Sequence, residues 1–316
     1  NSVNVSGGSL IVKNGGSLIQ TNNSAVNTGS IVLERTSSVR GSDYVYWSSP
    51  VASFSSAAIS PGTDSYYIWK WNPSLTNYNG GQGYWQSGNE TMTLGKGYIV
   101  KGPDAYTETP TPFTASFTGI PNNGIIQSNI SRGSYTGANY AGTNGATITS
   151  NDDNWNLLGN PYPSAIDAVA FLSANPNIAG NVRLWTHGTE ISQGGSTFYA
   201  TFGYNYNVND YINYNGTGST PPGFNGKIGA GQGFFVIMNE STAPTETVTF
   251  NNSMRNSSFS NSQFYKTTNS AQTVSEKNRI WISLLNSNQQ AVTTLVGYVT
   301  GASLDQDRLF DAEHKI

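Results

Sequence analysis

The stretch Asn154-Trp155-Asn156-Leu157-Leu158-Gly159-Asn160-Pro161-Tyr162-Pro163-Ser164 decides the fold of this chain. Its first half has the apolar and aromatic character of a buried strand, and its prolines end that strand because proline cannot donate to a strand ladder. Ser164, with Asp167 three places on, predicts the capped start of a short helix. A looser copy, Tyr44-Val45-Tyr46-Trp47-Ser48-Ser49-Pro50-Val51, lies earlier in the sequence.

The landmarks that follow the two copies recur in the same order. A strand around Trp69 in the first copy corresponds to one around Trp185 in the second. Leu94-Gly95-Lys96-Gly97-Tyr98-Ile99-Val100 likewise corresponds to Ala230-Gly231-Gln232-Gly233-Phe234-Phe235-Val236. We therefore expect a tandem duplication, with one β-sandwich-like lobe in residues 44–150 and the second in residues 151–255. The alternative is that the two copies are halves of one continuous sandwich.

Residues 1–43 predict the rungs of a β-solenoid. Three short apolar segments each follow a glycine corner: Gly7-Gly8-Ser9-Leu10-Ile11-Val12, Gly15-Gly16-Ser17-Leu18-Ile19 and Gly29-Ser30-Ile31-Val32. Stacked strands need tight turns, which glycine makes at low cost. A pair of hairpins is the alternative interpretation of these short repeats.

Residues 256–316 predict a linker and the first strands of a further, truncated β domain. Apolar runs at 279–285 and 292–299 favour a paired ribbon. Two strands alone are not stable in water, so we expect further strands beyond it. The start at Asn1, without Met or an apolar signal segment, suggests a piece of a longer protein. The fold class expected for the whole chain is all-β.

The composition excludes several classes of function. Charged residues make up 10% of the chain, against about 25% in an ordinary soluble domain. The net charge of −3 provides no basic surface for nucleic acid. The absence of cysteine excludes disulfides and thiolate chemistry. No apolar run of about eighteen residues is present, so we expect no helical membrane span.

Residues suited to catalysis are few, and we expect no enzymatic activity. His187 and His314 are the only histidines, and no Gly-x-Ser-x-Gly elbow supports a catalytic serine. A glycosidase needs two facing carboxylates, for which the candidates are Asp152, Asp153, Asp167 and Glu190. The glycines around Lys96 lead into a strand, whereas a phosphate-binding loop leads into a helix.

Tyrosines of an insertion in the second copy are the candidate ligand-binding residues: Tyr204, Tyr206, Tyr211 and Tyr214. Exposed tyrosine rings stack on sugar faces or pack against a protein partner at low entropic cost. The alternative is that these rings cover a sandwich that has few aliphatic side chains.

Three aspartates near the end of the chain, Asp305, Asp307 and Asp311, form a candidate calcium site. Calcium prefers hard oxygen ligands, but the spacing lacks the glycine of an EF-hand loop. A solvated acidic turn is the alternative interpretation. We expect no other cofactor.

The combined motifs resemble large modular cell-surface and secreted proteins of Bacteroidota. The resemblance depends on the proline-ended strands at Trp47 and Leu158, the two Gly-x-Gly strands, and the stretch from Arg279 to Ala302. It implies export by the type IX secretion system and an extracellular or cell-surface location. The C-terminal sorting domain of such proteins is not present in this sequence.

Together these patterns predict a non-catalytic extracellular structural or adhesive module. A carbohydrate-binding module of a secreted polysaccharide-degrading enzyme is the alternative, and a polysaccharide hydrolase or lyase is a further one. The expected partners are the type IX machinery during export and surface glycans or other surface proteins.

Overall fold

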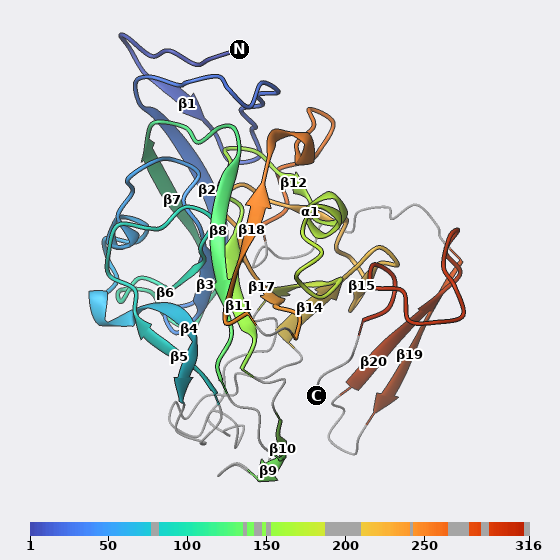
Figure 1. Ribbon diagram of the computed structural model, residues 1–316. Coiled ribbons are helices and arrows are strands. Elements are labelled where there is room, and N and C mark those ends of the chain that lie inside the picture. The colour runs from blue at the N-terminus through green and yellow to red at the C-terminus, as the bar shows by residue number, and fades with distance from the viewer. Residues whose placement is uncertain are drawn as a thin grey trace.

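A computed structural model gives the fold, which is all-β, with 42% of residues in strands and 7% in helices. It describes residues 1–76, 82–134, 138–141, 147–149, 153–186, 210–240, 243–264, 278–285 and 291–312. Within these ranges no helix has the length and apolar character that a membrane span needs. The strands form several separate sheets (Figure 1). The all-β class expected from the sequence is confirmed.

The N-terminal sheet has the order β1-β2-β7, with β1 at Leu10–Val12, β2 at Ile31–Val39 and β7 at Thr111–Gly119. β1 and β2 are parallel, so two of the three expected rungs do lie side by side. The segment at residues 16–19 is not a rung, because the Leu18 amide donates instead to the Pro163 carbonyl at 2.8 Å. β2 continues antiparallel to β7, and no solenoid or barrel closes in the described part of the chain.

The first large sheet is antiparallel and four-stranded, in the order β3 (Tyr44–Trp47), β6 (Tyr98–Lys101), β4 (Ile68–Thr76) and β5 (Gln82–Ser87). Side chains alternate between its faces, as strand geometry requires. Val45 and Trp47 pack with β2 and β7 in one core, whereas Tyr46 belongs to a different cluster on the opposite face.

The second large sheet is antiparallel with the order β11 (Trp155–Gly159), β17 (Gly233–Ile237), β13 (Val182–Trp185), β14 (Tyr211–Tyr214) and β15 (Ser219–Thr220). Its first four strands follow the order of their counterparts in the first sheet. The register agrees as well: Trp47 lies opposite Tyr98 in one sheet, and Leu158 opposite Phe234 in the other. These are corresponding positions when the chain is counted from Pro50 and Pro161.

The predicted helix is present as α1 (Ala168–Ala174), but its capping residue differs from the expectation. Asp167 is the N-cap and accepts from the Ala170 amide at 2.8 Å, while Ser164 accepts from Arg255 Nε at 2.7 Å. The helix begins later because β12 (Ile166–Asp167) pairs with β16 (Lys227–Ile228) and stays extended.

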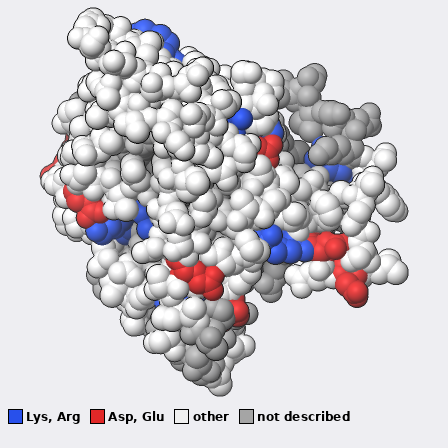
Figure 2. Space-filling view, turned by 45° about the horizontal axis from the view of Figure 1, so that its top comes forward, with Lys and Arg blue, Asp and Glu red and all other residues white. Residues whose placement is uncertain are grey.

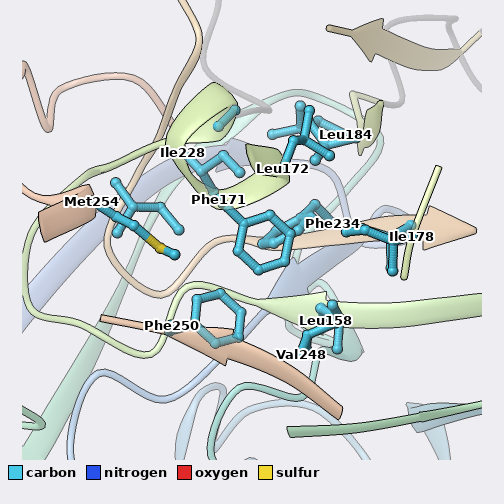
Figure 3. Close-up of a cluster of buried hydrophobic side chains, with 14 of the residues drawn as sticks. Leu158, Phe171, Leu172, Ile178, Leu184, Ile228, Phe234, Val248, Phe250 and Met254 are labelled. Atoms are coloured by element: carbon cyan, nitrogen blue, oxygen red, sulfur yellow. The ribbon is translucent and has the colours of Figure 1, made fainter. Parts of the chain in front are cut away.

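The second sheet is covered by α1 and by the pair β8 (Ile126–Ser131) and β18 (Thr245–Phe250). Figure 3 shows Phe171 and Leu172 of α1 pointing into this core beside Phe250 and Phe234. The rings of Phe171 and Phe250 are stacked, with centroids 4.8 Å apart. Each large sheet therefore has its own hydrophobic core, on the face turned away from the other sheet.

The smaller elements include the predicted C-terminal ribbon, which is confirmed as the antiparallel pair β19 (Arg279–Leu285) and β20 (Ala291–Gly297). One face contacts the second sheet, with Trp281 Nε1 donating to the Ser219 carbonyl at 3.0 Å. The other face is exposed, Ile280 by 61% and Tyr298, just after β20, by 82%. The other short elements are β9 (Tyr140–Ala141), β10 (Thr147–Ile148) and the 3₁₀ turns at Ser56–Ala58, Ser65–Tyr67 and Asn252–Met254.

Candidate functional site

The two large sheets meet at a junction of reciprocal contacts. The Ser48 amide donates to the Gly231 carbonyl at 2.8 Å, and the Gly159 amide donates to the Gly95 carbonyl at 3.0 Å. Gly95 and Gly231 both have positive φ, 74° and 68°, a conformation that favours glycine. Each Gly-x-Gly turn therefore supplies an acceptor to the opposite sheet, which fixes the two sheets relative to each other.

Beside these contacts lies the junction cluster, an aromatic-rich group from the facing sides of both sheets. Phe235 is at its centre, with ring centroids 5.6–6.2 Å from those of five neighbours: Tyr46, Trp71, Trp85, Trp155 and Tyr211. Tyr46 is also stacked on Trp185 at 5.9 Å and 10°. Aromatic pairs of this kind add about 0.5–1.5 kcal/mol each beyond burial, so the cluster is a stiff third core.

Six rings of the cluster are only half-buried, and the four of them that surround Phe235 form what we call the aromatic rim: Trp71, Trp85, Trp155 and Tyr211. Trp71 Nε1 donates to the Trp155 carbonyl at 2.8 Å, which links the rim across the two sheets. A Cβ at Gly83 would lie 2.2 Å from Trp71 Cζ2, so this ring rests directly on the glycine. The rim therefore presents fixed apolar faces next to solvent.

A polar cleft of about 340 Å³ lies next to the rim, at the end of the second sheet where β11 and β13 begin and β17 ends. Arg183 connects the two features, because it lines the cleft and its guanidinium lies 4.2 Å from the Trp155 ring centroid. The side chains that give the cleft its polar character are Asn154, Asn181, Arg183, Asn239, Glu240, Gln306, Arg308 and Asp311.

The four predicted tyrosines do not form one site in the described residues. Tyr211 belongs to the rim, and its hydroxyl lies 2.6 Å from that of Tyr46. Tyr214 packs against the core of the second sheet, 4.9 Å from the Phe224 ring centroid. Burial, followed by the nearby Asp167 carboxylate, raises the pKa of Tyr214 to about 12. Tyr204 and Tyr206 lie outside the described residues.

Two of the three predicted calcium ligands accept hydrogen bonds from nearby backbone amides through their carboxylates. Asp307 accepts from the Ser303 amide, and Asp311 accepts from the Asp307 amide at 2.7 Å. Asp305 lies in the same turn with its backbone amide on Ser303 Oγ at 3.2 Å. In the part of the chain that the structure describes, no group of three or more His, Asp or Glu side chains is placed to hold a metal. The structure therefore does not bring these three aspartates together as a ligand set.

The carboxylates and histidines considered as catalytic candidates either have a structural role or lie outside the described residues. Asp167 caps α1 and pairs with Lys227. Asp153 is buried. His187, His314, Asp152 and Glu190 lie outside the described residues.

Burial shifts the pKa values of two side chains near the junction, Tyr44 and Lys96. Burial is the largest cause that raises the pKa of Tyr44 to about 12. Burial lowers the pKa of Lys96 to about 8, and the ammonium donates to the Asn129 carbonyl. The turn around Lys96 leads directly into β6, as expected for a structural turn.

Sequence reasoning missed most of the aromatic rim and the whole polar cleft. Trp71 and Trp85 lie directly opposite each other across β4 and β5. Their meeting with Trp155 depends on the junction between the sheets. That contact has no local signal in the sequence.

These features define an all-β protein in which two like-ordered antiparallel sheets meet through an aromatic junction. The family described as a domain of unknown function, DUF8693, matches residues 1–316, and the chain belongs to that family. No curated protein and no solved structure matches the chain.

Proposed function

We propose that this chain is a non-catalytic structural or adhesive module of a secreted bacterial surface protein. The observation that carries the proposal is the reciprocal junction, which joins two sheets and three cores into one stiff body. Charged groups are sparse on the face in Figure 2, where small blue and red groups are separated by uncharged surface. A stiff body with a neutral polar surface suits a stalk or a display scaffold outside the cell.

The finer architecture that we propose is a tandem duplication of one β unit. The shared strand order, the matching register around Trp47 and Leu158, and the paired glycine turns support it. Each copy is a sandwich-like lobe with its own core. The parallel pair β1 and β2 supports a solenoid-like start to the chain, and the ribbon of β19 and β20 supports a further β unit after the second lobe.

The location can be tested in a bacterium of the Bacteroidota that carries this gene. We expect the protein to be labelled by a membrane-impermeant biotin reagent on intact cells or to be recovered from the medium. Disabling the type IX machinery is expected to retain the protein inside the cell envelope. Recovery of the protein from the cytoplasm of both the wild-type and the secretion-deficient bacteria would reject the extracellular proposal. A known cytoplasmic enzyme serves as the control for the fractionation.

A second candidate function is carbohydrate binding, which the aromatic rim specifically favours. Rings of Trp and Tyr that are held rigidly and half-exposed can stack on the apolar faces of sugar rings without losing much entropy. The rim has four such rings, fixed by the Trp71–Trp155 hydrogen bond and by the glycine beneath Trp71. The sugars would be those of surface or environmental polysaccharides.

Trp85→Ala is expected to weaken oligosaccharide binding by about two- to tenfold, the equivalent of one lost aromatic contact. The measurement is a screen of the full chain on an array of neutral glycans, followed by titration calorimetry on the best ligand. Tyr298→Ala is the matched control, because this tyrosine is an exposed aromatic on the distant ribbon. An equal loss with both variants, or no loss with Trp85→Ala, would count against the rim.

A further inference from the structure

We propose that the polar cleft binds one unit of a neutral, polyhydroxylated sugar. This inference rests on the carbohydrate-binding function proposed above and adds to it a second, chemically distinct subsite. The rim would hold the apolar face of a sugar chain, and the cleft would hold the hydroxyls of one residue in that chain.

The size of the cleft fits this ligand class. Its volume of about 340 Å³ is near the lower end of small-molecule sites, which span roughly 300–1,000 Å³. That space accommodates a single sugar unit with its hydration. The other units of a longer sugar chain would lie outside the cleft. A ligand that enters the cleft can therefore extend across Trp155 onto the rim.

The chemistry of the lining favours hydroxyl groups over apolar groups. Amide side chains supply both donors and acceptors, which are what vicinal hydroxyls of a sugar require. The cleft has four of them: Asn154, Asn181, Asn239 and Gln306. Several are held by hydrogen bonds to the body of the protein, such as Asn181 Nδ2 to Asn213 Oδ1 at 2.6 Å and Asn239 Nδ2 to the Pro176 carbonyl at 2.8 Å. Their orientations are therefore set before a ligand arrives.

The charges of the lining favour a neutral ligand. The lining contains two arginines, Arg183 and Arg308, and two carboxylates, Glu240 and Asp311, so the formal charges of its side chains sum to zero. Glu240 also pairs with Arg132, at 2.5 Å between Nη1 and Oε2. A carboxylated or aminated sugar would bring a charge that this balanced lining does not complement.

The C-terminal segment forms the outer wall of the cleft, and it is firmly attached. Arg308 donates to three carbonyls in the last turn of α1 and the segment after it, those of Leu172, Asn175 and Ile178, at 2.6–2.8 Å. The Phe310 carbonyl accepts from Thr217 Oγ1 at 2.7 Å. The wall is thus part of the folded body, as a preformed site requires.

The test is titration calorimetry of the full chain with glucose, galactose and mannose, their disaccharides, and glucuronate as the charged comparison. The cleft variants are Asn239→Ala and Gln306→Ala. The matched control is Asn177→Ala, a neighbouring amide that donates to the Thr247 carbonyl and does not line the cleft. Thermal unfolding of every variant checks that the fold is kept.

We expect binding of at least one neutral sugar, weakened by about fivefold or more in each cleft variant and unchanged in Asn177→Ala. Binding of neutral oligosaccharides that is lost in Trp85→Ala but kept in both cleft variants would overturn this inference and leave the rim proposal standing. Tighter binding of glucuronate than of glucose would overturn the neutral class. Absence of all sugar binding would overturn both proposals.

Discussion

Asn160→Ala is expected to lower the free energy of unfolding by about 3–6 kcal/mol, because one buried amide serves four backbone groups. Asn160 Nδ2 donates to the carbonyls of Ser164, Ile228 and Gly229 at 2.8–3.0 Å. Its Oδ1 accepts from the Tyr162 amide at 3.0 Å. The residue is fully buried, so water cannot replace these bonds when the side chain is removed.

The measurement is denaturant unfolding followed by tryptophan fluorescence and by circular dichroism, with the two transitions compared. Asn177→Ala is the control, because that amide makes an exposed hydrogen bond and its loss is expected to cost less than about 0.5 kcal/mol. A loss below about 1 kcal/mol for Asn160→Ala would mean that the turn after β11 is stabilised in another way.

Gly159→Ala is expected to cost about 2–4 kcal/mol, because the added methyl group would enter the junction between the sheets. A Cβ at this position would lie 2.2 Å from Ser48 Cβ and 2.7 Å from Ser48 Oγ. Both residues lie on short segments whose amides are fixed by the opposite glycine turns, so neither backbone can move without breaking a reciprocal hydrogen bond.

A double variant that also replaces Ser48 by glycine removes the side chain with which the new methyl group would clash. In Ser48→Gly/Gly159→Ala the nearest remaining atom is the Gln232 carbonyl oxygen, 3.3 Å from the new Cβ. We expect the double variant to recover more than half of the loss, despite a cost of about 0.5–1 kcal/mol for the new glycine. Additive losses in a double-mutant cycle, measured by the same denaturant unfolding, would contradict the contact between Ser48 and residue 159.

The strand that ends at Pro161 was predictable because its signals are local. Apolar and aromatic side chains predict β11, and the two prolines that follow predict where it stops; the helix after them was predicted from similarly local signals. The N-cap was misplaced at Ser164, since nothing local reveals that β16 pairs with residues 166–167 and delays the helix. The repeated order of landmarks predicted that the two halves contain corresponding strands, but it did not predict the order in which those strands pair.

The site was less accessible to such reasoning. Tyr211 was selected because its segment is rich in tyrosine, and it does lie on the rim. Tyr214, on the same strand, was selected for the same reason, but it packs against the core beside Phe224. The prediction did not take into account that residues 211 and 214, three positions apart, point to opposite faces of a strand. The cleft combines residues from three strand ends with Gln306 and Arg308, which are more than sixty residues away from the nearest of them. Contacts over such separations leave no pattern in a single sequence.

The reciprocal junction also bears on how a chain of this kind could arise. In it, the Gly95 and Gly231 carbonyls each accept a hydrogen bond from an amide on the other half of the molecule. An ancestor with a single half would have left those groups and the rings around Phe235 uncovered, unless two identical chains met about a twofold axis. Gene fusion would then have turned an obligate pair into one polypeptide and freed each half to diverge. The two turns differ at their central residue, which is Lys96 in one and Gln232 in the other.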